Sequence, residues 1–346
     1  MHITFLAYRL DRSRLMTTEF YRQDIEILRS LGYEVDIATS LREVPAKTDL
    51  VFLWWWNWLW LVGPILKLRR LPICVTGSLE PDIYEKRSWL YRILVRNGMR
   101  FADQSVFVSQ YMIDRLSQLM SLRNPLLCPH IVLDEYRLST SDNRRTMPNV
   151  IFNVAWKKAA NVRRKMQIEL IEAFKLVSDA LPEARLVLAG EPMDGQAIME
   201  RRCEELDLTN RVRFLGKISK DDKIRHMQNC GAYYQCSRHE GFGVAIAEAM
   251  ACGAPVVVNR KTAIPEVVGP CGYYVTDETP EAIAKTLKTV LTNQTDAAEL
   301  GKRAAARIDC EFRFGRRREF FSTLLSKMLS RRGSSESVSE RKKLVA

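Results

Sequence analysis

Short apolar runs alternate with helical stretches along most of this chain. The runs are apolar at successive positions, a pattern typical of parallel strands that are buried on both faces. Strands that alternate with helices in this way predict an α/β fold with doubly wound sheets. We expect strands at residues 3–7, 35–38, 50–53, 73–76, 105–108, 150–153, 185–189, 212–215, 232–235, 256–259 and 273–275. We expect helices at residues 17–32, 165–180, 194–206 and 280–292.

The alternation weakens once, in the polar segment 139–148, which ends at Pro148. This segment predicts a linker between two domains, residues 1–143 and residues 144–310. A chain of 346 residues is long enough to bury two such cores. A further helix is expected over residues 311–330. The polar tail, residues 331–346, is expected to be disordered.

The apolar segment 50–66 admits two interpretations. It is nearly long enough to cross a bilayer, but it contains Asn57, Gly63 and Pro64. A strand, a helix and the next strand at 73–76 explain it as a βαβ unit, which is the interpretation we favour. Its five tryptophans, Trp54 to Trp60, fit either a packed core or a surface that meets lipid, and the sequence leaves both open.

The chain carries a formal net charge of +12, which favours anionic partners. Nucleic acid is not expected among them, because neither zinc-finger spacing nor an RNP-type strand is present. The eight cysteines form no CxxC pair and several lie in apolar runs, as in a reducing compartment. No signal-peptide pattern is visible, so we expect a cytoplasmic protein. The four histidines lack metal-ligand spacing, so no metal site is expected.

The segment SRHEGFGVAIAEAMACGAPVVVN contains a strand end, a glycine loop and a helix. The helix is expected to begin near Gly243 and Val244 and to end at Gly253, with Pro255 just beyond. A glycine loop that leads into a helix exposes backbone N–H groups and the positive end of the helix dipole. The segment therefore predicts a phosphate site at the carboxyl end of a parallel strand.

Two glutamates belong to the same segment. The helix is apolar on nearly all sides, so Glu248 is expected to be buried. Helical side chains lean toward the N-terminus, which directs Glu248 toward the loop that carries Glu240. Carboxylates there can accept hydrogen bonds from ribose and hexose hydroxyls. The alternative is that Glu248 forms a salt bridge with a neighbour and that Glu240 is an ordinary loop residue.

The pattern Glu240-x7-Glu248 in EGFGVAIAEAMACGAPVV, followed by IPEVV, resembles the donor site of the retaining GT-B glycosyltransferases of family four. LVLAGE and RVRFLGKIS support this resemblance, and VFVSQYM and CPHIVLDEY in the first half resemble the family more weakly. The resemblance implies two Rossmann-like domains that face a cleft. It also implies a C-terminal helix that returns toward the first domain.

The resemblance implies roles for individual residues. Glu240 would contact hydroxyls of the donor sugar, and Glu248 would hold the ribose of the nucleotide. Glu266 would support the pocket. The remaining donor contacts would come from the loop residues Gly241, Phe242, Gly243 and Val244.

The family also places an arginine and a lysine on the diphosphate, where negative charge accumulates as the nucleotide leaves. Lys165 matches the lysine. Glu240 and Lys165 are our two candidate catalytic residues. The position of the arginine falls near Trp156. Its substitute is left open between Lys157 or Lys158 and an arginine that reaches in, Arg163 or Arg164. The alternative is a solvated basic loop.

The acceptor is expected in the first domain, where the family's glycine turn after the first strand is missing. Arg12 and Thr17 follow that strand, and Thr76 and Gly77 end another. These four residues are our candidates for the acceptor side.

The function that follows is transfer of a sugar, with retention, from a nucleotide-diphosphate sugar to an acceptor hydroxyl, in polysaccharide or glycolipid assembly. No cofactor is expected. The expected partners are the nucleotide sugar, a saccharide or lipid-linked acceptor, and the inner face of a membrane. Two alternatives stay open: a weak scaffold that binds nucleotide sugars without turnover, and a sugar-nucleotide epimerase or hydrolase on the same fold. The sequence does not name the donor base, the sugar or the acceptor.

Overall fold

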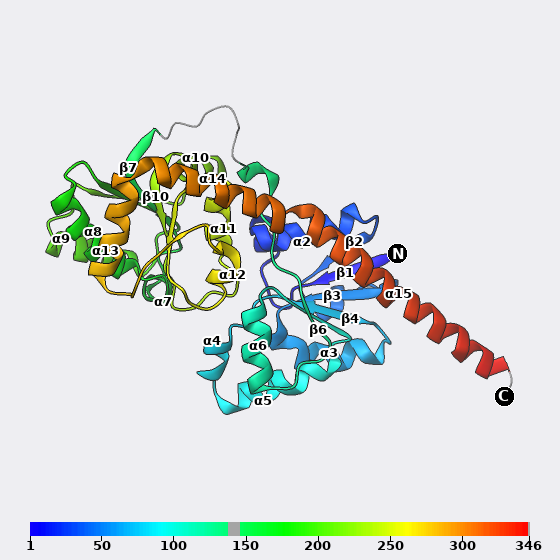
Figure 1. The fold of residues 1–346 in the computed structure, drawn as a ribbon. Helices are drawn as coiled ribbons and strands as arrows, with labels where there is room; N and C mark the ends of the chain where they lie inside the picture. The colour runs from blue at the N-terminus through cyan, green and yellow to red at the C-terminus, as the bar shows by residue number, and fades with distance from the viewer. Residues whose placement is uncertain (138–145, 345–346) are drawn as a thin grey trace. The chain divides into compact units, whose positions relative to one another are not determined.

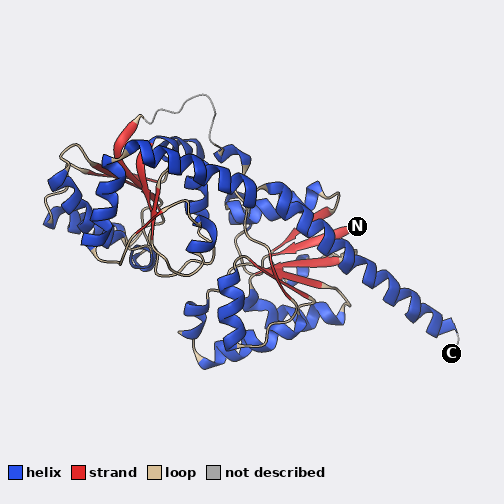
Figure 2. Cartoon of the chain, viewed as in Figure 1, coloured by secondary structure: helices blue, strands red, loops and turns tan. Residues whose placement is uncertain are grey.

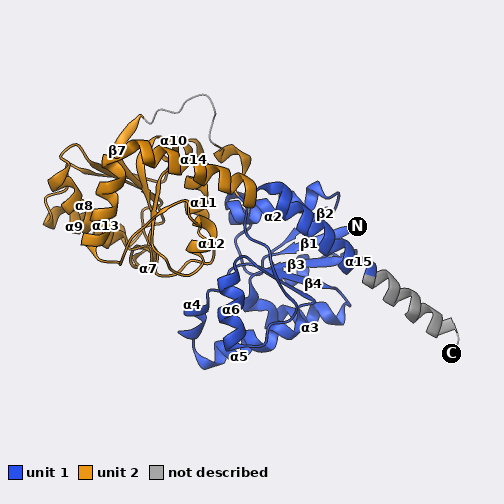
Figure 3. Ribbon diagram, in the orientation of Figure 1, with its two compact units in different colours: residues 1–131, 312–346 blue, residues 132–311 orange. Residues whose placement is uncertain are grey.

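The computed structural model describes residues 1–137 and 146–344, with side chains described as far as Ser330. The chain divides into two compact units (Figure 3). Unit 1 comprises residues 1–131 and 312–346, and unit 2 comprises residues 132–311. The division falls between Ile131 and Val132, before the boundary at 143/144 that the polar segment indicated. Most of that segment, residues 138–145, lies outside the described residues.

Unit 1 contains a parallel sheet, whose strands are drawn in red in Figure 2. The strand order is β2-β1-β3-β4-β5-β6. Its strands are β1 (His2–Leu6), β2 (Glu34–Ala38), β3 (Leu50–Trp54), β4 (Ile73–Thr76), β5 (Gln104–Phe107) and β6 (Pro125–Leu127). The first five confirm the predicted strands to within one residue at each end. Strand β6 was not predicted; it is an exposed strand of three residues that begins with proline, as an edge strand can.

Helices cover both faces of this sheet (Figure 1). Helix α15 packs against α2, and α3 packs against α5. The α-helices of unit 1 are α1 (Arg12–Thr17), α2 (Glu19–Ser30), α3 (Leu59–Leu68), α4 (Pro81–Glu85), α5 (Trp89–Gly98), α6 (Gln110–Leu119) and α15 (Phe314–Leu344). Its 3-10 helices are η1 (Leu41–Glu43), η2 (Trp56–Trp58) and η3 (Met99–Phe101).

The apolar segment 50–66 forms β3, η2 and the greater part of α3, and β4 follows, which confirms the βαβ interpretation. Of the described residues, none form a helix with both the length and the apolar character that crossing a bilayer requires. Trp54 and Trp56 are each 1% exposed, whereas Trp55, Trp58 and Trp60 are partly buried. The tryptophan cluster is therefore mainly a packing element of unit 1.

A buried ion pair joins α15 to α2 inside unit 1. Arg317 is 1% exposed, and its guanidinium donates to both oxygens of Asp24, at 2.7 and 3.0 Å. The same guanidinium donates to the carbonyls of Cys128 and Pro129 at 2.7 and 2.9 Å. The Trp54 indole N–H donates to Asp24 at 3.0 Å. Both charges are thus fully hydrogen bonded, which a buried ion pair requires.

Helix α15 also contributes apolar side chains to the core of unit 1, among them Phe321 and Leu325, which are fully buried. Its backbone is helical as far as Leu344, whereas the sequence indicated a disordered tail over 331–346. The tail contains no proline, which would interrupt a helix, and its glutamates, lysines and arginines favour a helix, although Gly333 and four serines do not.

Unit 2 contains a second parallel sheet, in the order β12-β11-β10-β7-β8-β9. Its strands are β7 (Met147–Val154), β8 (Arg185–Ala189), β9 (Val212–Gly216), β10 (Cys230–Tyr234), β11 (Val256–Val258) and β12 (Tyr273–Tyr274). Its helices are η4 (Asp134–Tyr136), α7 (Ala159–Arg164), α8 (Gln167–Ala180), α9 (Gln196–Glu205), α10 (Lys220–Asn229), α11 (Val244–Ala251), α12 (Ile264–Val268), α13 (Pro280–Thr292) and α14 (Gln294–Glu311). The two parallel sheets with their helices confirm the predicted α/β class.

Asp24→Asn should destabilise the protein by about 3–5 kcal/mol, because it leaves the Arg317 charge buried without its counter-ion. Urea unfolding followed by tryptophan fluorescence measures this loss. The matched control is Asp179→Asn, which removes the exposed pair of Asp179 with Lys175 and should cost less than about 1 kcal/mol. Equal losses in the two variants would contradict a structural role for the buried pair.

Candidate functional site

The order of strands in unit 2 marks the place where a ligand can bind. β7 and β10 are neighbours, and from them the chain order runs outward in opposite directions. Open α/β sheets bind ligands at the carboxyl ends of the strands beside such a reversal, because the two connections leave toward opposite faces. Here the loop after β7 leads to Lys165, and the loop after β10 leads to Glu240.

Glu240 is 8% exposed, and its carboxylate is held from several sides. Oε1 accepts hydrogen bonds from the Ser237 hydroxyl at 3.0 Å and from the Gln235 amide at 3.1 Å. The Glu240 backbone N–H donates to the Thr262 hydroxyl at 3.0 Å. Oε1 also accepts a hydrogen bond from the Lys165 ammonium. These contacts fix the position of the carboxylate before any ligand binds.

Two adjacent cations face Glu240. Lys165 forms an ion pair with Oε1, and a guanidinium nitrogen of Arg164 lies 3.7 Å from Oε2. The same guanidinium nitrogen donates to the carbonyl of His239 at 2.9 Å. Burial by itself would raise the pKa of Glu240, but the charges of Lys165 and Arg164 outweigh it and hold that pKa below its ordinary value.

The structure distinguishes among the cations that the sequence left open. Of the four, Arg164 contacts Glu240. Lys157 is 1% exposed, its ammonium nitrogen has no hydrogen-bond partner, and burial lowers the pKa of Lys157 to about 7. Lys158 is exposed and caps the start of α7. Arg163 lies in the last turn of α7. Lys157 and Lys158 were two of the expected substitutes for the family arginine. No described contact joins either of them to Glu240.

Glu248 is 4% exposed, which confirms its predicted burial, and it has a cation of its own. The Lys223 ammonium from α10 lies 3.1 and 3.0 Å from the two carboxylate oxygens. The same ammonium lies 4.9 Å from the centre of the Tyr136 ring. The salt bridge that we weighed as an alternative for Glu248 is therefore present. Lys223 was missed, because its pairing joins two helices and leaves no local pattern in the sequence.

The glycine loop leads into α11 as predicted. Gly243 has φ +98°, and a Cβ there would lie 3.2 Å from the Ile246 side chain, so glycine suits the position. Its carbonyl accepts from the N–H groups of Ile246 and Ala247 at 3.0 Å each. In the described part of the chain, the N–H groups of Val244 and Ala245 donate to no protein acceptor. These two donors can meet an anion.

The other predicted donor residues surround this loop. Gly241 and Phe242 are buried, and Val244 is the first residue of α11. Glu266 is partly buried in α12, where its carbonyl accepts from Arg307 at 2.8 Å. The residues that hold Glu240 in place were not predicted, because they are ordinary polar residues with no distinctive spacing: Gln235, Ser237 and Thr262.

The four acceptor candidates lie in unit 1, in two places. Arg12 and Thr17 are exposed on α1. Thr76 is buried at the end of β4, where its hydroxyl has no hydrogen-bond partner, and Gly77 follows with φ +123°. No described contact joins the two pairs. Among the described residues no group of three or more His, Cys, Asp and Glu side chains is arranged to hold a metal ion.

Comparisons with known proteins bear on the same region of the chain. Residues 143–307 match the family model of glycosyl transferases group 1, and this range contains Lys165, Glu240 and Glu248. The chain is 34% identical over 124 residues to a GDP-mannose-dependent alpha-(1-6)-phosphatidylinositol dimannoside mannosyltransferase of Mycobacterium tuberculosis, which covers 35% of this chain and 31% of that protein. It is 25% identical over 256 residues to an N-acetyl-alpha-D-glucosaminyl L-malate synthase of Bacillus anthracis, which covers 72% and 64% of the two chains. The chain thus spans about a third of the first relative's length.

Solved structures show the same fold over nearly the whole chain. A sucrose-phosphate synthase from Thermosynechococcus elongatus superposes with a TM-score of 0.81 at 18% identity, covering 95% of this chain and 99% of that one. HepE of Anabaena, in complex with UDP and glucose, gives a TM-score of 0.76 at 20% identity and covers 94% and 100%. The predicted GT-B fold is confirmed by these similarities.

Replacing Glu240 by glutamine should lower stability at neutral pH and have a smaller effect in acid. A depressed folded-state pKa stabilises the protein above the unfolded-state value, here 4.5, and the stabilisation is lost as pH falls through the folded-state value. Urea unfolding at about pH 7 should show a loss of about 3–5 kcal/mol, because Lys165 keeps a buried charge.

The same measurement at about pH 3.5 should show a smaller difference between wild type and Glu240→Gln. Glu169→Gln is the matched control, since Glu169 pairs with the half-exposed Arg238 at 2.7 Å. It should change stability by less than about 1 kcal/mol. A pH-independent effect of Glu240→Gln would contradict the ion pair.

Proposed function

We propose that this chain, whose residues 143–307 belong to the group 1 glycosyl transferases, transfers a sugar from a nucleotide-diphosphate donor to an acceptor hydroxyl. The observation that carries the proposal is the buried Glu240 carboxylate, held by Lys165 and Arg164 at the strand reversal of unit 2. The names of two similar proteins support a nucleotide-sugar donor, since one depends on GDP-mannose and the other binds UDP and glucose.

The donor diphosphate has three sources of positive charge or hydrogen bonds in this arrangement. Lys165 and Arg164 are the cations, and the free N–H groups of Val244 and Ala245 begin α11. A diphosphate gains negative charge as its bond to the sugar breaks, so cations placed in advance stabilise the transition state more than the ground state. Lys165 would then lie between Glu240 and the diphosphate.

Glu240 is best suited to bind hydroxyls of the donor sugar. A carboxylate with two cations and two neutral donors is a weak nucleophile, so we assign it no covalent step. We expect retention of anomeric configuration on the strength of the resemblance to retaining enzymes. Glu248 would accept ribose hydroxyls while Lys223 compensates its charge.

The second candidate function is a scaffold that binds nucleotide sugars without turning them over, and one observation favours it. By the resemblance, the position of the family arginine falls near Trp156, whose side chain is 59% exposed. Arg164 speaks for the enzyme, because it brings a guanidinium to Glu240 from a different position. Release of nucleoside diphosphate from a panel of UDP-, GDP-, ADP- and dTDP-sugars separates the two. No release from any donor, with or without a cell-extract acceptor, would contradict the enzyme.

Lys165→Gln should lower kcat by about 10²–10³, the typical effect of removing one donor that stabilises developing charge. Steady-state release of nucleoside diphosphate measures it, with the donor that the panel identifies. Lys175→Gln is the control, since Lys175 lies on the neighbouring helix α8 and pairs with Asp179 at the surface. A wild-type kcat in Lys165→Gln would remove that residue from the mechanism.

The membrane-facing surface that we propose for unit 1 is α5. Trp89 and Leu90 are 67% and 52% exposed at its first turn. Arg92 and Arg96 are exposed on the same helix, and in the described part of the chain neither has a carboxylate partner. Exposed aromatic and basic residues on one helix suit an interface with anionic lipid. This surface replaces the Trp54 to Trp60 cluster as our candidate for lipid contact, and a lipid-linked acceptor is compatible with it.

The double variant Trp89→Ser/Arg92→Gln should weaken binding to vesicles of anionic phospholipid by at least about tenfold, since each basic residue near such a surface contributes about 1 kcal/mol. Vesicle sedimentation at physiological salt measures the change. Trp156→Ser is the control, because Trp156 is a similarly exposed tryptophan in unit 2. Equal binding by all three proteins would exclude α5 as the membrane-facing surface.

A further inference from the structure

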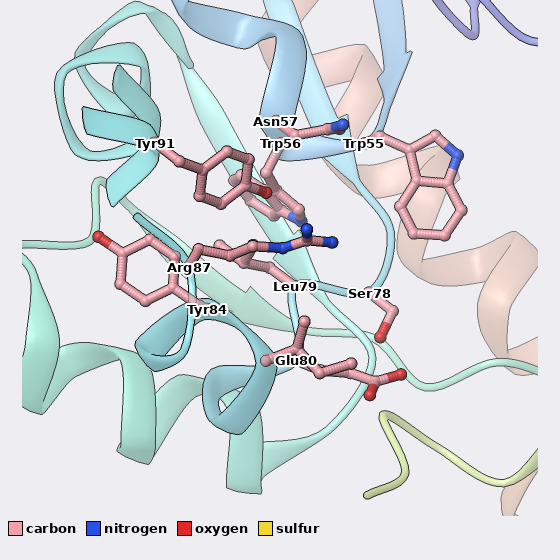
Figure 4. A pocket seen from close by; sticks show the side chains of 10 residues that line it. Trp55, Trp56, Asn57, Ser78, Leu79, Glu80, Tyr84, Arg87 and Tyr91 are labelled. Carbon is pink, nitrogen blue, oxygen red and sulfur yellow. The ribbon is translucent and has the colours of Figure 1, made fainter. Parts of the chain in front are cut away.

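A pocket of about 240 Å³ opens in unit 1 at the carboxyl ends of β3 and β4 (Figure 4). Trp55, Trp56 and Asn57 line it from the segment after β3, and Ser78 and Glu80 line it from the segment after β4. In this sheet too the strand order reverses nearby, between β1 and β3. The pocket therefore lies where a parallel sheet places its ligands.

The walls of the pocket are aromatic and largely fixed. The Trp56 indole stacks on Phe107 with ring centres 4.6 Å apart and an angle of 10° between the planes. Its N–H donates to the carbonyl of Gly77 at 3.4 Å. The Tyr84 hydroxyl donates to the carbonyl of Arg92 at 3.0 Å, and the Tyr91 ring lies 6.4 Å from the Tyr84 ring. Trp56 and Tyr84 are only 1% and 4% exposed and form the fixed base of the pocket. The partly buried rings of Trp55 and Tyr91 are the aromatic surfaces that a sugar ring can meet.

The backbone is strained at this pocket. Trp55 has φ +81°, a conformation that is an outlier for a bulky side chain. Its indole N–H donates to the Tyr21 hydroxyl at 2.7 Å. A Cβ on Gly77 would lie 3.3 Å from the Trp55 backbone nitrogen. Glycine at the end of the neighbouring strand therefore leaves room for the backbone of Trp55. Strain of this kind is retained where it positions a functional side chain.

Three side chains at the pocket have hydrogen-bonding capacity that no described protein group uses. The Ser78 hydroxyl is buried without a hydrogen bond, and the Asn57 amide makes none. Arg87 has no carboxylate partner, and its guanidinium lies 5.7 Å from the centre of the Tyr91 ring. Figure 4 shows the Arg87 side chain extended across the pocket, with Tyr91 on one side and Glu80 on the other.

We propose that this pocket binds the acceptor as a phosphorylated saccharide or cyclic polyol, an inference that rests on the proposed glycosyl transfer. The ring lies against the aromatic walls, and Glu80, Ser78 and Asn57 meet its hydroxyls. The phosphate binds the Arg87 guanidinium, whose planar fork matches phosphate oxygens. Arg92 and Arg96, whose charges act on the neighbouring Tyr84, add positive potential that favours a dianion.

The test measures binding to the full chain without any donor, so that it does not depend on turnover. Glucose 6-phosphate, methyl glucoside and inorganic phosphate are titrated separately by ligand-observed NMR. We expect glucose 6-phosphate to bind at least about tenfold more tightly than either of the others, since charge-assisted hydrogen bonds and ring contacts act together. Arg87→Gln should remove the preference for the phosphorylated sugar, and Tyr91→Ala should weaken both sugars.

Lys86→Gln is the matched control, because Lys86 is exposed, adjacent in sequence and outside the pocket lining. It should leave all three affinities unchanged. An unchanged preference in Arg87→Gln, or equal binding of inorganic phosphate and glucose 6-phosphate, would overturn the proposal. A further arm of the test uses phosphatidylinositol in phosphatidylcholine vesicles. Vesicle binding that depends on Arg87 identifies a lipid-linked source of the phosphate. If glucose 6-phosphate binds and the vesicles do not, the source is a soluble sugar phosphate.

Failure of this proposal is distinct from failure of the proposed function. Release of nucleoside diphosphate with water as acceptor depends on Lys165 and Glu240 in unit 2, so it reports on the donor site, and it should persist in the control variant Lys86→Gln. Wild-type protein that releases nucleoside diphosphate from a donor but shows no preference for glucose 6-phosphate would reject the pocket and keep glycosyl transfer. If no donor in the panel releases nucleoside diphosphate but glucose 6-phosphate still binds in a way that depends on Arg87, the result would reject glycosyl transfer and keep the pocket.

Discussion

The buried pair of Asp24 and Arg317 is the interaction on which unit 1 depends. It joins residues 293 positions apart in the chain and is bonded in turn to Trp54 and to the carbonyls of Cys128 and Pro129. Charges in an apolar core are tolerated only when every lone pair and proton has a partner, so this network fixes α15, α2 and the end of β3 together. The strained Trp55 follows directly, and the aromatic pocket begins there.

Unit 2 uses the same physical device for a different purpose. Glu240 is also buried among cations, but its partners Arg164 and Lys165 lie at the end of α7, in the connection that follows β7 at the carboxyl edge of the sheet. Each partner, Lys165 or Arg164, carries hydrogen-bond capacity that a diphosphate can use. A buried charge network in the core of a unit stabilises its fold, whereas the network at the strand ends of unit 2, under the function proposed above, holds charges ready for a substrate.

Much of the fold follows from the sequence, because continuous apolar runs and glycine-terminated helices are local patterns. Eleven of the twelve strands were predicted, and β6 was missed since three exposed residues beginning with Pro125 leave no apolar signal. The burial of Glu248 was also predicted from the apolar helix around it. Pairings between distant segments were beyond reach: Lys223 with Glu248, and Arg317 with Asp24, have no fixed spacing. The choice of Arg164 among four basic residues depends on the course of α7, which composition does not determine.

The discontinuous course of unit 1 has a consequence for how the protein is made. Residues 1–131 leave the ribosome first, yet their core includes Phe321 and Leu325, and the Asp24 carboxylate is buried beside Arg317. Unit 2, residues 132–311, is continuous and is synthesised in full before Arg317 appears. Nascent domains usually fold as soon as their residues are available. In this chain the unit that begins second is therefore the first to have all its residues, and unit 1 completes its core only after unit 2 has been translated.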